Sequence, residues 1–294
     1  MKRIPAVATL AGRRVLVTGA ARGIGSLLAE RLHERGARVA LLGLEPDLLS
    51  ATAQHCGGVP WRHCDVGARD AVDSAVAELV AALGGLDVVV ANAGIARQLP
   101  LVGGVPEVME RTLQVNVLGT YYTLRAAGPH LSHPNGYALV VSSLAAAVQL
   151  PLLGAYSASK AAVEALGNTL RAEIGPTGAR VGVAYFSELD TDMTARGFDT
   201  DAARRLLGNR PLTRVTPVVV GINALERAIA RRARTAVAPR WVAPILPLRA
   251  VVQRVVDRTR RGGVEAALRI AREEEVPFTT AQPERPSTVS GEVR

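Results

Sequence analysis

Short apolar runs alternate along this chain with longer segments in which apolar residues recur every three or four positions. The first such pair is a run at Arg14–Thr18 and a periodic segment at Ile24–Arg35. The short runs predict strands and the longer period predicts helices. Unbroken runs such as Val88–Val90 are typical of parallel strands that helices cover on both faces. We therefore expect an α/β fold, a three-layer doubly wound domain with a mostly or fully parallel sheet of about seven strands.

The same pattern predicts where the individual elements begin and end. Strands are expected at Arg14–Thr18, Arg38–Leu42, Val59–Cys64, Leu86–Ala91, Tyr137–Ser142, Val181–Phe186 and Thr235–Ala238. Helices are expected at Ile24–Arg35, Asp47–His55, Ala68–Leu83, Glu107–His130, Ala155–Ile174, Asp199–Leu207, Val218–Arg232, Pro247–Thr259 and Val264–Glu274. We assign residues 1–238 to the doubly wound domain and residues 239–276 to a basic helical C-terminal extension. Residues 277–294 are rich in Pro, Ser, Thr and charge, which predicts a disordered tail.

Composition narrows the classes of function. The 294 residues are 48% hydrophobic, which is enough for a sizeable core. A net charge of +9 would suit a nucleic-acid partner, but much of it comes from arginines late in the chain, and aromatic residues make up only 3%. Proteins that bind single-stranded nucleic acid need more aromatic side chains to stack on the bases. We expect no nucleic-acid partner.

The cysteines and the lengths of the apolar runs exclude further classes. Cys56 and Cys64 are the chain's two cysteines, and they form neither a Cys-x-x-Cys pair nor a set with matched histidines. This pattern predicts neither a disulfide framework nor a metal site. The sequence has no signal-peptide pattern and no apolar run of the roughly 18 residues that a membrane span needs. We expect a cytoplasmic protein.

The stretch 241–261 mixes apolar residues with arginines at helical spacing. Basic amphipathic helices can lie on anionic membranes, which would make the protein peripherally membrane-associated. An apolar stripe of this kind more often docks on its own domain or on a second subunit, while the arginines stay in water. We favour docking and keep membrane contact as the alternative.

A glycine-rich turn connects the first predicted strand to the first helix. Gly19, Gly23 and Gly25 have the spacing Gly-x-x-x-Gly-x-Gly, and Ile24 lies between the last two. Residues without a Cβ allow the backbone to approach a pyrophosphate, which the N–H groups and the positive end of the helix stabilise. The sequence of strand, turn and helix predicts a dinucleotide site, with a purely structural turn as the alternative.

The end of the second strand, which normally distinguishes NAD from NADP, leaves both open. Gly43 supplies no carboxylate for a ribose 2′-hydroxyl, and Leu44 supplies no guanidinium for a 2′-phosphate. Arg22 could reach a 2′-phosphate, and Glu45 could reach a 2′-hydroxyl. Because the usual acid is missing, the sequence leans slightly towards NADP.

Two further strand ends carry residues that suit the same ligand. Asp65 and Val66 follow the third strand, where the carboxylate could bond an adenine or cap the next helix. Asn92, Ala93 and Gly94 follow the fourth strand, at the edge where open α/β sheets bind ligands. Both ends are therefore expected beside the glycine-rich turn.

Tyr156 and Lys160 are the candidates for chemistry. They stand four residues apart on a predicted helix, so their side chains share a face. Lys160 and Lys2 are the chain's lysines among 35 basic residues, which indicates that position 160 needs an ammonium and not a guanidinium. A nearby ammonium lowers the pKa of a phenol from its ordinary value of about 10. Ser142 or Ser143, at a strand end, could bond a reacting carbonyl oxygen or simply cap the strand.

Taken together, these residues resemble those of one protein family. The order and spacing of the short-chain dehydrogenase/reductase family recur in Thr18-Gly19-x-x-x-Gly23-x-Gly25, Asn92-Ala93-Gly94, Asn116, Ser143 and Tyr156-x-x-x-Lys160. The resemblance covers about Ala11 to Val237. It implies a Rossmann-type sheet of seven strands and the reversible oxidation of an alcohol to a carbonyl by hydride exchange with NAD(P).

The resemblance also implies a role for each candidate residue. Tyr156 would be the general acid/base, Ser143 would orient and polarise the substrate oxygen, and Lys160 would bind the nicotinamide ribose and lower the Tyr156 pKa. Asn116 would hold a water in the proton relay. Related enzymes pair their subunits through the helices that carry Asn116 and Tyr156, so we expect a homodimer or homotetramer.

One segment departs from the family pattern. The family usually has Pro-Gly before a stretch that ends in Thr, whereas this chain has Ser187-Glu188 and then Thr191, which could still bond the carboxamide. We expect an altered substrate shape and not a loss of activity. The predicted activity interconverts a secondary alcohol and a ketone or aldehyde on a small apolar or lipid-like substrate. A catalytically inactive dinucleotide-binding sensor or scaffold is the alternative.

Overall fold

The computed structural model describes residues 10–194, 200–207, 214–259 and 263–283. Seven strands form one sheet in the order β3-β2-β1-β4-β5-β6-β7, and every neighbouring pair is parallel. The strands are β1 (Arg14–Thr18), β2 (Arg38–Gly43), β3 (Trp61–His63), β4 (Val88–Ala91), β5 (Tyr137–Val141), β6 (Arg180–Phe186) and β7 (Thr235–Ala238). The order reverses between β1 and β4, where a crevice for ligands opens at the carboxyl ends of the strands. The predicted seven-stranded parallel sheet is confirmed.

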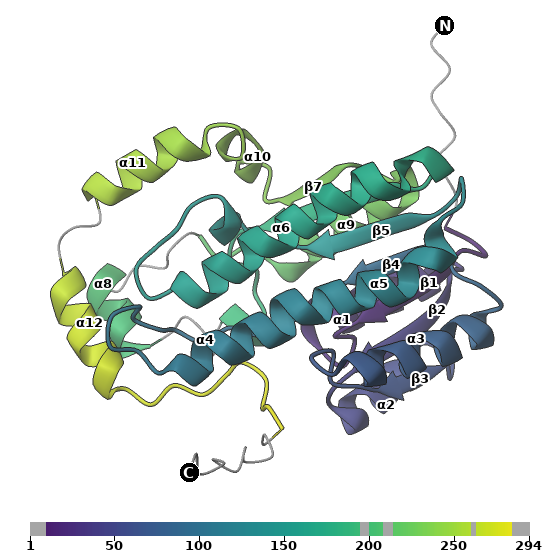
Figure 1. The fold of residues 1–294 in the computed structure, drawn as a ribbon, viewed down its shortest axis with the longest axis horizontal. Coiled ribbons are helices and arrows are strands. Elements are labelled where there is room, and N and C mark those ends of the chain that lie inside the picture. Colours follow the sequence, from purple (N-terminus) through teal and green to yellow (C-terminus); the bar gives the residue numbers. More distant parts are fainter. Residues whose placement is uncertain (1–9, 195–199, 208–213, 260–262, 284–294) are drawn as a thin grey trace, which may run out of the picture.

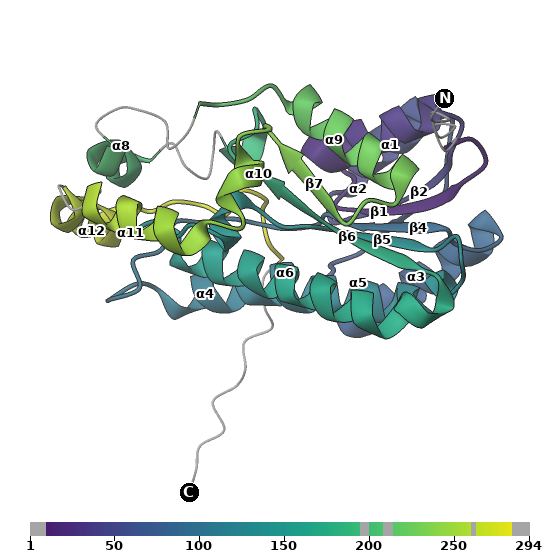
Figure 2. The same ribbon diagram turned by 90° about the horizontal axis from the view of Figure 1, so that it is seen from above.

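Helices cover both faces of this sheet and give the molecule three layers (Figure 2). One face carries α1 (Gly23–Glu34), α2 (Pro46–His55) and α9 (Val218–Arg231), and the other carries α3 (Arg69–Leu83), α4 (Pro106–Leu113), α5 (Gly119–Leu131) and α6 (Gly154–Ile174). Successive side chains of a strand point to opposite faces. In β1, therefore, Val15 and Val17 are buried in the same core cluster as Leu28 of α1, whereas Leu16 is buried with Leu79 of α3.

The structure corrects one predicted helix. The segment expected as a single helix at Glu107–His130 is divided into α4, a π-helical turn at Gln114–Leu118 and α5. Single π turns inside helices are rare and often mark functional sites. Asn116 lies in this turn, where its side chain bonds the backbone of Ile95 on the neighbouring strand end. A tertiary contact of this kind leaves no trace in helical periodicity.

The predicted helical C-terminal extension is present at one end of the sheet (Figure 1). It contains α10 (Val242–Ile245), α11 (Arg249–Thr259) and α12 (Val264–Glu273), and α12 packs against α8 (Asp201–Leu207). The predicted start of the α8 helix, Asp199, lies outside the described residues. Within the described part of the chain, no helix combines the length and the apolar character that crossing a membrane requires.

Residues 277–283 of the segment expected as a disordered tail pack against the domain in this structure. Phe278 packs against two buried clusters, and Thr279 is only 2% exposed because it hydrogen-bonds the backbone of Ala96. The polar composition of this segment predicted disorder and gave no sign that Phe278 and Thr279 would anchor it. Residues 284–294 of the predicted tail lie outside the described residues.

Candidate active site

The turn between β1 and α1 packs closely because Gly19 and Gly25 have no side chains. A Cβ on Gly25 would lie 2.1 Å from the carbonyl oxygen of Gly19, and a Cβ on Gly19 would lie 2.8 Å from the Cα of Ala93. Gly19 and Gly23 also adopt positive φ angles of +64° and +60°. Arg22, the residue before α1, does not cap the helix with its side chain. The turn therefore forms a cradle in which helix N–H groups can meet an anion.

The end of β4 is tied to this cradle by hydrogen bonds. The Thr18 hydroxyl oxygen accepts from the backbone N–H groups of Asn92 and Ala93, each at 3.1 Å. The Asn92 side chain in turn donates to the carbonyl oxygens of Thr18 and Gly19, at 3.0 and 3.3 Å. These bonds account for the placing of Asn92 and Ala93 beside the glycines, where the sequence predicts them.

A cavity lies over the carboxyl ends of β1, β2 and β4. Its walls include the predicted coenzyme residues Gly19, Arg22, Gly23, Ile24, Asp65, Val66, Asn92, Ala93, Gly94 and Thr191. Gly25 packs directly under Gly19, as described above. Sequence reasoning missed three further wall residues, Thr279, Thr280 and Gln282, because they belong to the segment expected to be disordered.

Asp65 does not cap the helix that follows it. Its Oδ1 accepts from the Gly67 N–H at 2.9 Å, and its Oδ2 accepts from Arg111 Nη2 at 2.7 Å. The N-cap of α3 is Ala68, which makes no side-chain cap. The Asp65 carboxylate is thus fixed by two partners in the wall of the cavity, so the cap alternative is wrong.

A second cavity, of about 290 Å³, contains the candidate catalytic side chains, and we call it the chemical cavity. Ser143, Tyr156 and Lys160 line it, and most of the remaining wall is apolar. The two cavities adjoin, because both are lined by Ile24, Asn92, Gly94, Thr191 and Met193. A dinucleotide on the glycine cradle can therefore extend to the three chemical side chains.

Ser143 and Tyr156 meet directly, and Lys160 lies beside them. The Ser143 hydroxyl hydrogen-bonds the Tyr156 phenol. Lys160 Nζ lies 5.6 Å from the centre of the Tyr156 ring and donates to the carbonyl oxygen of Val141 at 2.9 Å. The Ser142 hydroxyl donates to the Lys160 carbonyl oxygen at 2.8 Å. Ser142 thus supports α6. Ser143 Oγ also accepts from the Ala145 N–H at 3.1 Å, so Ser143 caps the short turn after β5 as well as contacting the phenol.

Burial dominates the protonation of this pair. It raises the pKa of Tyr156, and the hydrogen bond from Ser143 only partly opposes this effect. It also lowers the pKa of Lys160 to about 8. The expected net lowering of the Tyr156 pKa is therefore wrong for this structure. Removing the phenolate from water destabilises it more than the neighbouring groups stabilise it. Lys160 nevertheless stays mainly charged at neutral pH.

Asn116 ties α6, the helix that carries Tyr156 and Lys160, to the loop after β4. Its Nδ2 donates to the Ile95 carbonyl oxygen and to the Ser159 hydroxyl, both at 2.9 Å, and its Oδ1 accepts from the Ile95 N–H at 2.8 Å. Ser159 passes the contact on by donating to the Tyr156 carbonyl oxygen at 2.7 Å. The side chain of Asn116 thus has a positioning role, and the expected bound water stays a prediction.

Residues 187–191, the segment in which the family usually has Pro-Gly, are held in place by backbone hydrogen bonds to Thr216. Glu188 accepts from the Thr216 N–H, and Thr216 accepts from the Asp190 N–H, both at 2.9 Å. Ser187 Oγ is buried and has no hydrogen-bond partner within the described residues. Together with the glycine cradle, this orphaned hydroxyl in the wall of the chemical cavity fits a bound polar group such as a carboxamide. Thr191 lies where the two cavities adjoin, as the sequence predicts.

The C-terminal extension completes the chemical cavity. Trp241 and Ile245, near α10, and Val252 and Val256 of α11 form part of its wall. An ion pair between Arg249 Nη2 and Glu164 Oε1, at 2.8 Å, ties α11 to α6. The structure favours docking of residues 241–259 on their own domain, and residues 260–261 of the predicted stretch lie outside the described residues. Sequence reasoning predicted the docking but missed the site, although the four-residue spacing of Trp241–Ile245 and Val252–Val256 was visible.

Comparisons with known proteins agree with this geometry. The family model described as short chain dehydrogenase matches residues 13–202. The chain is 34% identical to D-threitol dehydrogenase of Mycolicibacterium smegmatis over 67% of this chain and 79% of that protein. It is 28% identical to a fatty acyl-CoA reductase of Mycobacterium tuberculosis over 82% of this chain and 85% of that protein. A crystal structure of a dehydrogenase/reductase from Sinorhizobium meliloti 1021 superposes with a TM-score of 0.68 at 28% identity, covering 79% of this chain and 95% of that one.

The family model spans well over half of the chain, and it contains the glycine cradle, Asn116, Ser143, Tyr156 and Lys160. Most of the residues that carried the resemblance line the two adjoining cavities, whereas Thr18, Gly25 and Asn116 pack behind the lining residues. The chain belongs to the short-chain dehydrogenase family of NAD(P)-dependent oxidoreductases.

Proposed function

We propose that this protein interconverts a secondary alcohol and a ketone or aldehyde, with an apolar or lipid-like molecule as substrate and Tyr156 as general acid/base. The observation that carries the proposal is the contact between the Ser143 hydroxyl and the Tyr156 phenol in a cavity that adjoins the glycine cradle. NAD(P), when bound, supplies the hydride chemistry. The chain supplies position, exclusion of water and a proton.

Each chemical side chain has a task in this proposal. Ser143 holds the substrate oxygen next to the phenol, so that Tyr156 can give its proton to that oxygen in reduction and take one in oxidation. Lys160, whose ammonium is buried beside the Tyr156 ring, stabilises negative charge as it develops on the phenol oxygen. This electrostatic help matters because burial alone makes the phenol a weaker acid.

The walls of the chemical cavity support the substrate class. Apart from the catalytic groups, they are formed largely by apolar side chains, among them Val148, Leu150, Leu153, Met193, Trp241, Ile245, Val252 and Val256. Apolar walls with a few convergent polar groups bind apolar molecules and orient one functional group. The similar protein of Mycobacterium tuberculosis is named for a fatty acyl-CoA substrate, which agrees with a lipid-like molecule here.

We extend the proposal to the surroundings of the enzyme. We propose a cytoplasmic homodimer or homotetramer that pairs through the surfaces of α5 and α6. Tyr121 of α5 is 45% exposed and Leu118 just before it is 37% exposed, which supplies apolar area for such an interface. Peripheral membrane contact through the stretch 241–261 is the less favoured alternative. The coenzyme choice, for which the sequence leans to NADP, is argued separately below.

The first experiment is a titration of the full chain with NADH and NADPH, followed by turnover assays on a panel of ketones and secondary alcohols of increasing chain length. We expect binding of at least one coenzyme and turnover that improves with apolar chain length. Binding without turnover of any member of the panel would favour the alternative, an inactive dinucleotide-binding sensor or scaffold. Binding of neither coenzyme would contradict both.

A further inference from the structure

Residues 276–283, which we call the strap, follow α12 (Figure 1). The strap is bonded to the loop after β4: the Thr279 N–H donates to the Ala96 carbonyl oxygen at 3.1 Å, and the Ala96 N–H donates to Thr279 Oγ1 at 3.0 Å. Phe278 packs beside it, with the Arg97 guanidinium 5.5 Å from the centre of its ring. Two reciprocal bonds and a packed aromatic ring anchor the strap at this point.

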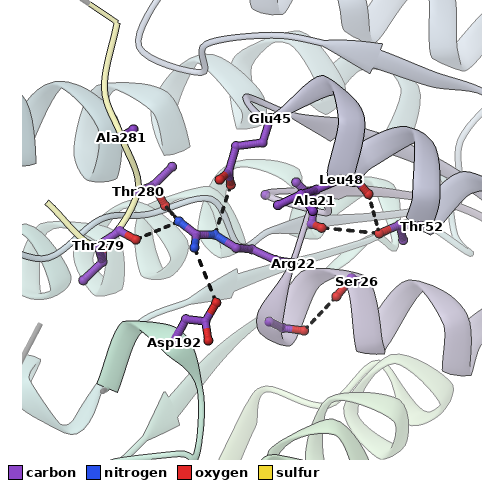
Figure 3. Close-up of polar contacts among 12 residues, drawn as sticks. Ala21, Arg22, Ser26, Glu45, Leu48, Thr52, Asp192, Thr279, Thr280 and Ala281 are labelled. Carbon is purple, nitrogen blue, oxygen red and sulfur yellow. Dashed lines mark hydrogen bonds and ion pairs between the residues drawn. The ribbon is translucent and has the colours of Figure 1, made fainter. Parts of the chain in front are cut away.

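From this anchor the strap reaches the Arg22 guanidinium in the coenzyme cavity (Figure 3). Arg22 Nη2 donates to the Thr279 carbonyl oxygen at 2.7 Å and to Thr280 Oγ1 at 2.8 Å. On its other side, Arg22 Nε pairs with Glu45 Oε2 at 3.0 Å, and Nη1 approaches Asp192 Oδ2 at 3.5 Å. A guanidinium has five N–H donors. Here four acceptors, two of them carboxylates, already surround it.

The strap holds a second wall residue through a relay of contacts. Gln282 Oε1 accepts from Arg111 Nε at 2.8 Å, and Arg111 Nη2 donates to Asp65 Oδ2 at 2.7 Å. Asp65, Gln282, Thr279 and Thr280 all line the same cavity. The strap is therefore bonded to both sides of this cavity, to Arg22 on one side and, on the other, to Arg111, which in turn bonds Asp65.

We propose that the strap is the outer wall of the adenosine subsite and that, by holding Arg22 against Glu45, it makes this site select NAD(H) over NADP(H). This inference rests on the proposed function, because it assigns a coenzyme to the same site. It reverses the lean towards NADP, which was based on the lack of an acid at Gly43. The carboxylate is instead supplied by Glu45, twenty positions after Gly25, the interval at which a ribose-binding acid is found.

The charges around Arg22 decide between the two coenzymes. A 2′-phosphate entering here would meet the carboxylates of Glu45 and Asp192, which repel it, and would have to displace the strap acceptors from the guanidinium. A 2′-hydroxyl can donate to Glu45 while Arg22 keeps its other partners. Arg22 could otherwise bind a phosphate, but its bonds to the strap give it a structural role instead.

The test compares the dissociation constants of NADH and NADPH, measured by nicotinamide fluorescence, for the full chain and three variants. In the full chain we expect NADH to bind about tenfold more tightly than NADPH. A chain that ends at Glu275 lacks the strap and should bind NADH about tenfold more weakly, with NADPH affinity unchanged or improved. Thr280→Val removes one bond to Arg22 and should reduce the preference about threefold.

Thr259→Val is the matched control, because among the described residues its hydroxyl bonds only its own helix, at Val255 and Val256, and it should leave both constants unchanged. Tighter binding of NADPH by the full chain would overturn the inference. So would a preference that stays the same in both Thr280→Val and the shortened chain, whereas failure of the full chain to bind either coenzyme would overturn the proposed function as well. Thr280→Val retains the rest of the strap, so it decides the question if the shortened chain does not fold.

Discussion

Lys160 shows a conflict between stability and chemistry at a single residue. The residue is only 5% exposed, and burial lowers the pKa of its ammonium to about 8. One hydrogen bond to the Val141 carbonyl oxygen compensates part of the desolvation. The scarcity of lysine in the sequence indicated that this position needs an ammonium, but the sequence could not show that the ammonium would be buried. Burial depends on the packing of α6 against β5, which brings distant segments together.

Replacing Lys160 with methionine should abolish most activity without destabilising the fold. We expect kcat to fall about 100-fold or more, because the developing phenolate loses its neighbouring charge. We expect the free energy of unfolding at pH 7 to be equal or higher, because a buried ammonium is replaced by an apolar side chain of similar length. Urea unfolding and steady-state turnover measure the two effects, and a large loss of stability with normal turnover would contradict the assignment.

The pH dependence of this stability difference has a defined sign. The folded-state pKa of Lys160, about 8, lies below its ordinary value of 10.5. Between these values the unfolded chain binds more protons, so the native protein gains stability relative to Lys160→Met as the pH rises. The advantage of the variant should be largest below pH 8 and should shrink towards pH 10.5. A difference that is constant over this range would show that Lys160 is not buried as an ammonium.

The glycine-rich turn was predictable as an element because its chemistry is local. Strand, turn and helix follow one another in the sequence, and steric requirements fix glycine at defined positions. The π turn at Gln114–Leu118 and the strap depended on distant partners, Ile95 and Arg22, so periodicity and composition could not predict them. Local sequence patterns therefore predict the glycine-rich turn, whereas the π turn and the strap can be located only from the tertiary structure.

Two alanine substitutions in the turn should differ in severity. In Gly25→Ala the new Cβ would meet the backbone oxygen of Gly19, so we expect a loss of about 2–4 kcal/mol in stability and no measurable coenzyme binding. In Gly23→Ala the Cβ would meet no atom within 4 Å, so only the positive φ is strained, at a cost of about 1 kcal/mol. Thermal unfolding and NADH titration measure both, and equal effects would contradict the steric argument.

We expect helix α11 to limit the length of substrate that the chemical cavity accepts. Val256 lines the chemical cavity, whereas the adjacent Val255 is 53% exposed. We expect Val256→Phe to raise KM about tenfold for the longest apolar substrates and to leave short ones unaffected, because the ring fills the far end of the cavity. Val255→Phe is the matched control and should leave KM unchanged at every chain length. A loss of turnover on short and long substrates alike would indicate a general distortion instead.

Across the whole molecule, the carboxyl ends of the strands and their amino ends have separate roles. The carboxyl edge carries the cradle and the catalytic groups, whereas the amino edge is held by an ion pair between Arg14 of β1 and Asp87, just before β4. Asp87 accepts from the Arg14 backbone N–H at 2.9 Å, from Nε at 3.0 Å and from Nη2 at 2.7 Å. Burial pushes the pKa of Asp87 up, but these bonds hold it below its ordinary value of 3.8. This contact should therefore support stability without touching catalysis.

Asp87→Asn tests that separation. We expect the free energy of unfolding at pH 7 to fall by about 1–3 kcal/mol and kcat to stay unchanged. Because the folded-state pKa of Asp87 is lowered, its contribution is complete well above pH 3.8 and declines as the pH falls below that value. Wild type and variant should therefore converge in stability towards low pH. A large change in kcat would show that the two edges are coupled.

The general architecture and the candidate catalytic groups of this molecule were accessible from sequence, because periodicity and motif spacing encode them directly. Part of the wall of the chemical cavity, and the whole strap, come from the C-terminal residues after β7, outside residues 13–202 that the family model matches. Their positions follow from contacts such as Arg249 with Glu164 and Arg22 with Thr280, which join residues 85 and 258 positions apart. No local pattern encodes such pairs.

The central claim is that Tyr156 moves the proton while the coenzyme is bound in the adjoining cavity. Its most direct test is Tyr156→Phe, measured for turnover of the best substrate and for coenzyme binding, with the exposed Tyr121→Phe as control. We predict that kcat falls about 100-fold or more in Tyr156→Phe, while the coenzyme dissociation constant changes less than about threefold. Undiminished turnover by Tyr156→Phe would contradict the account.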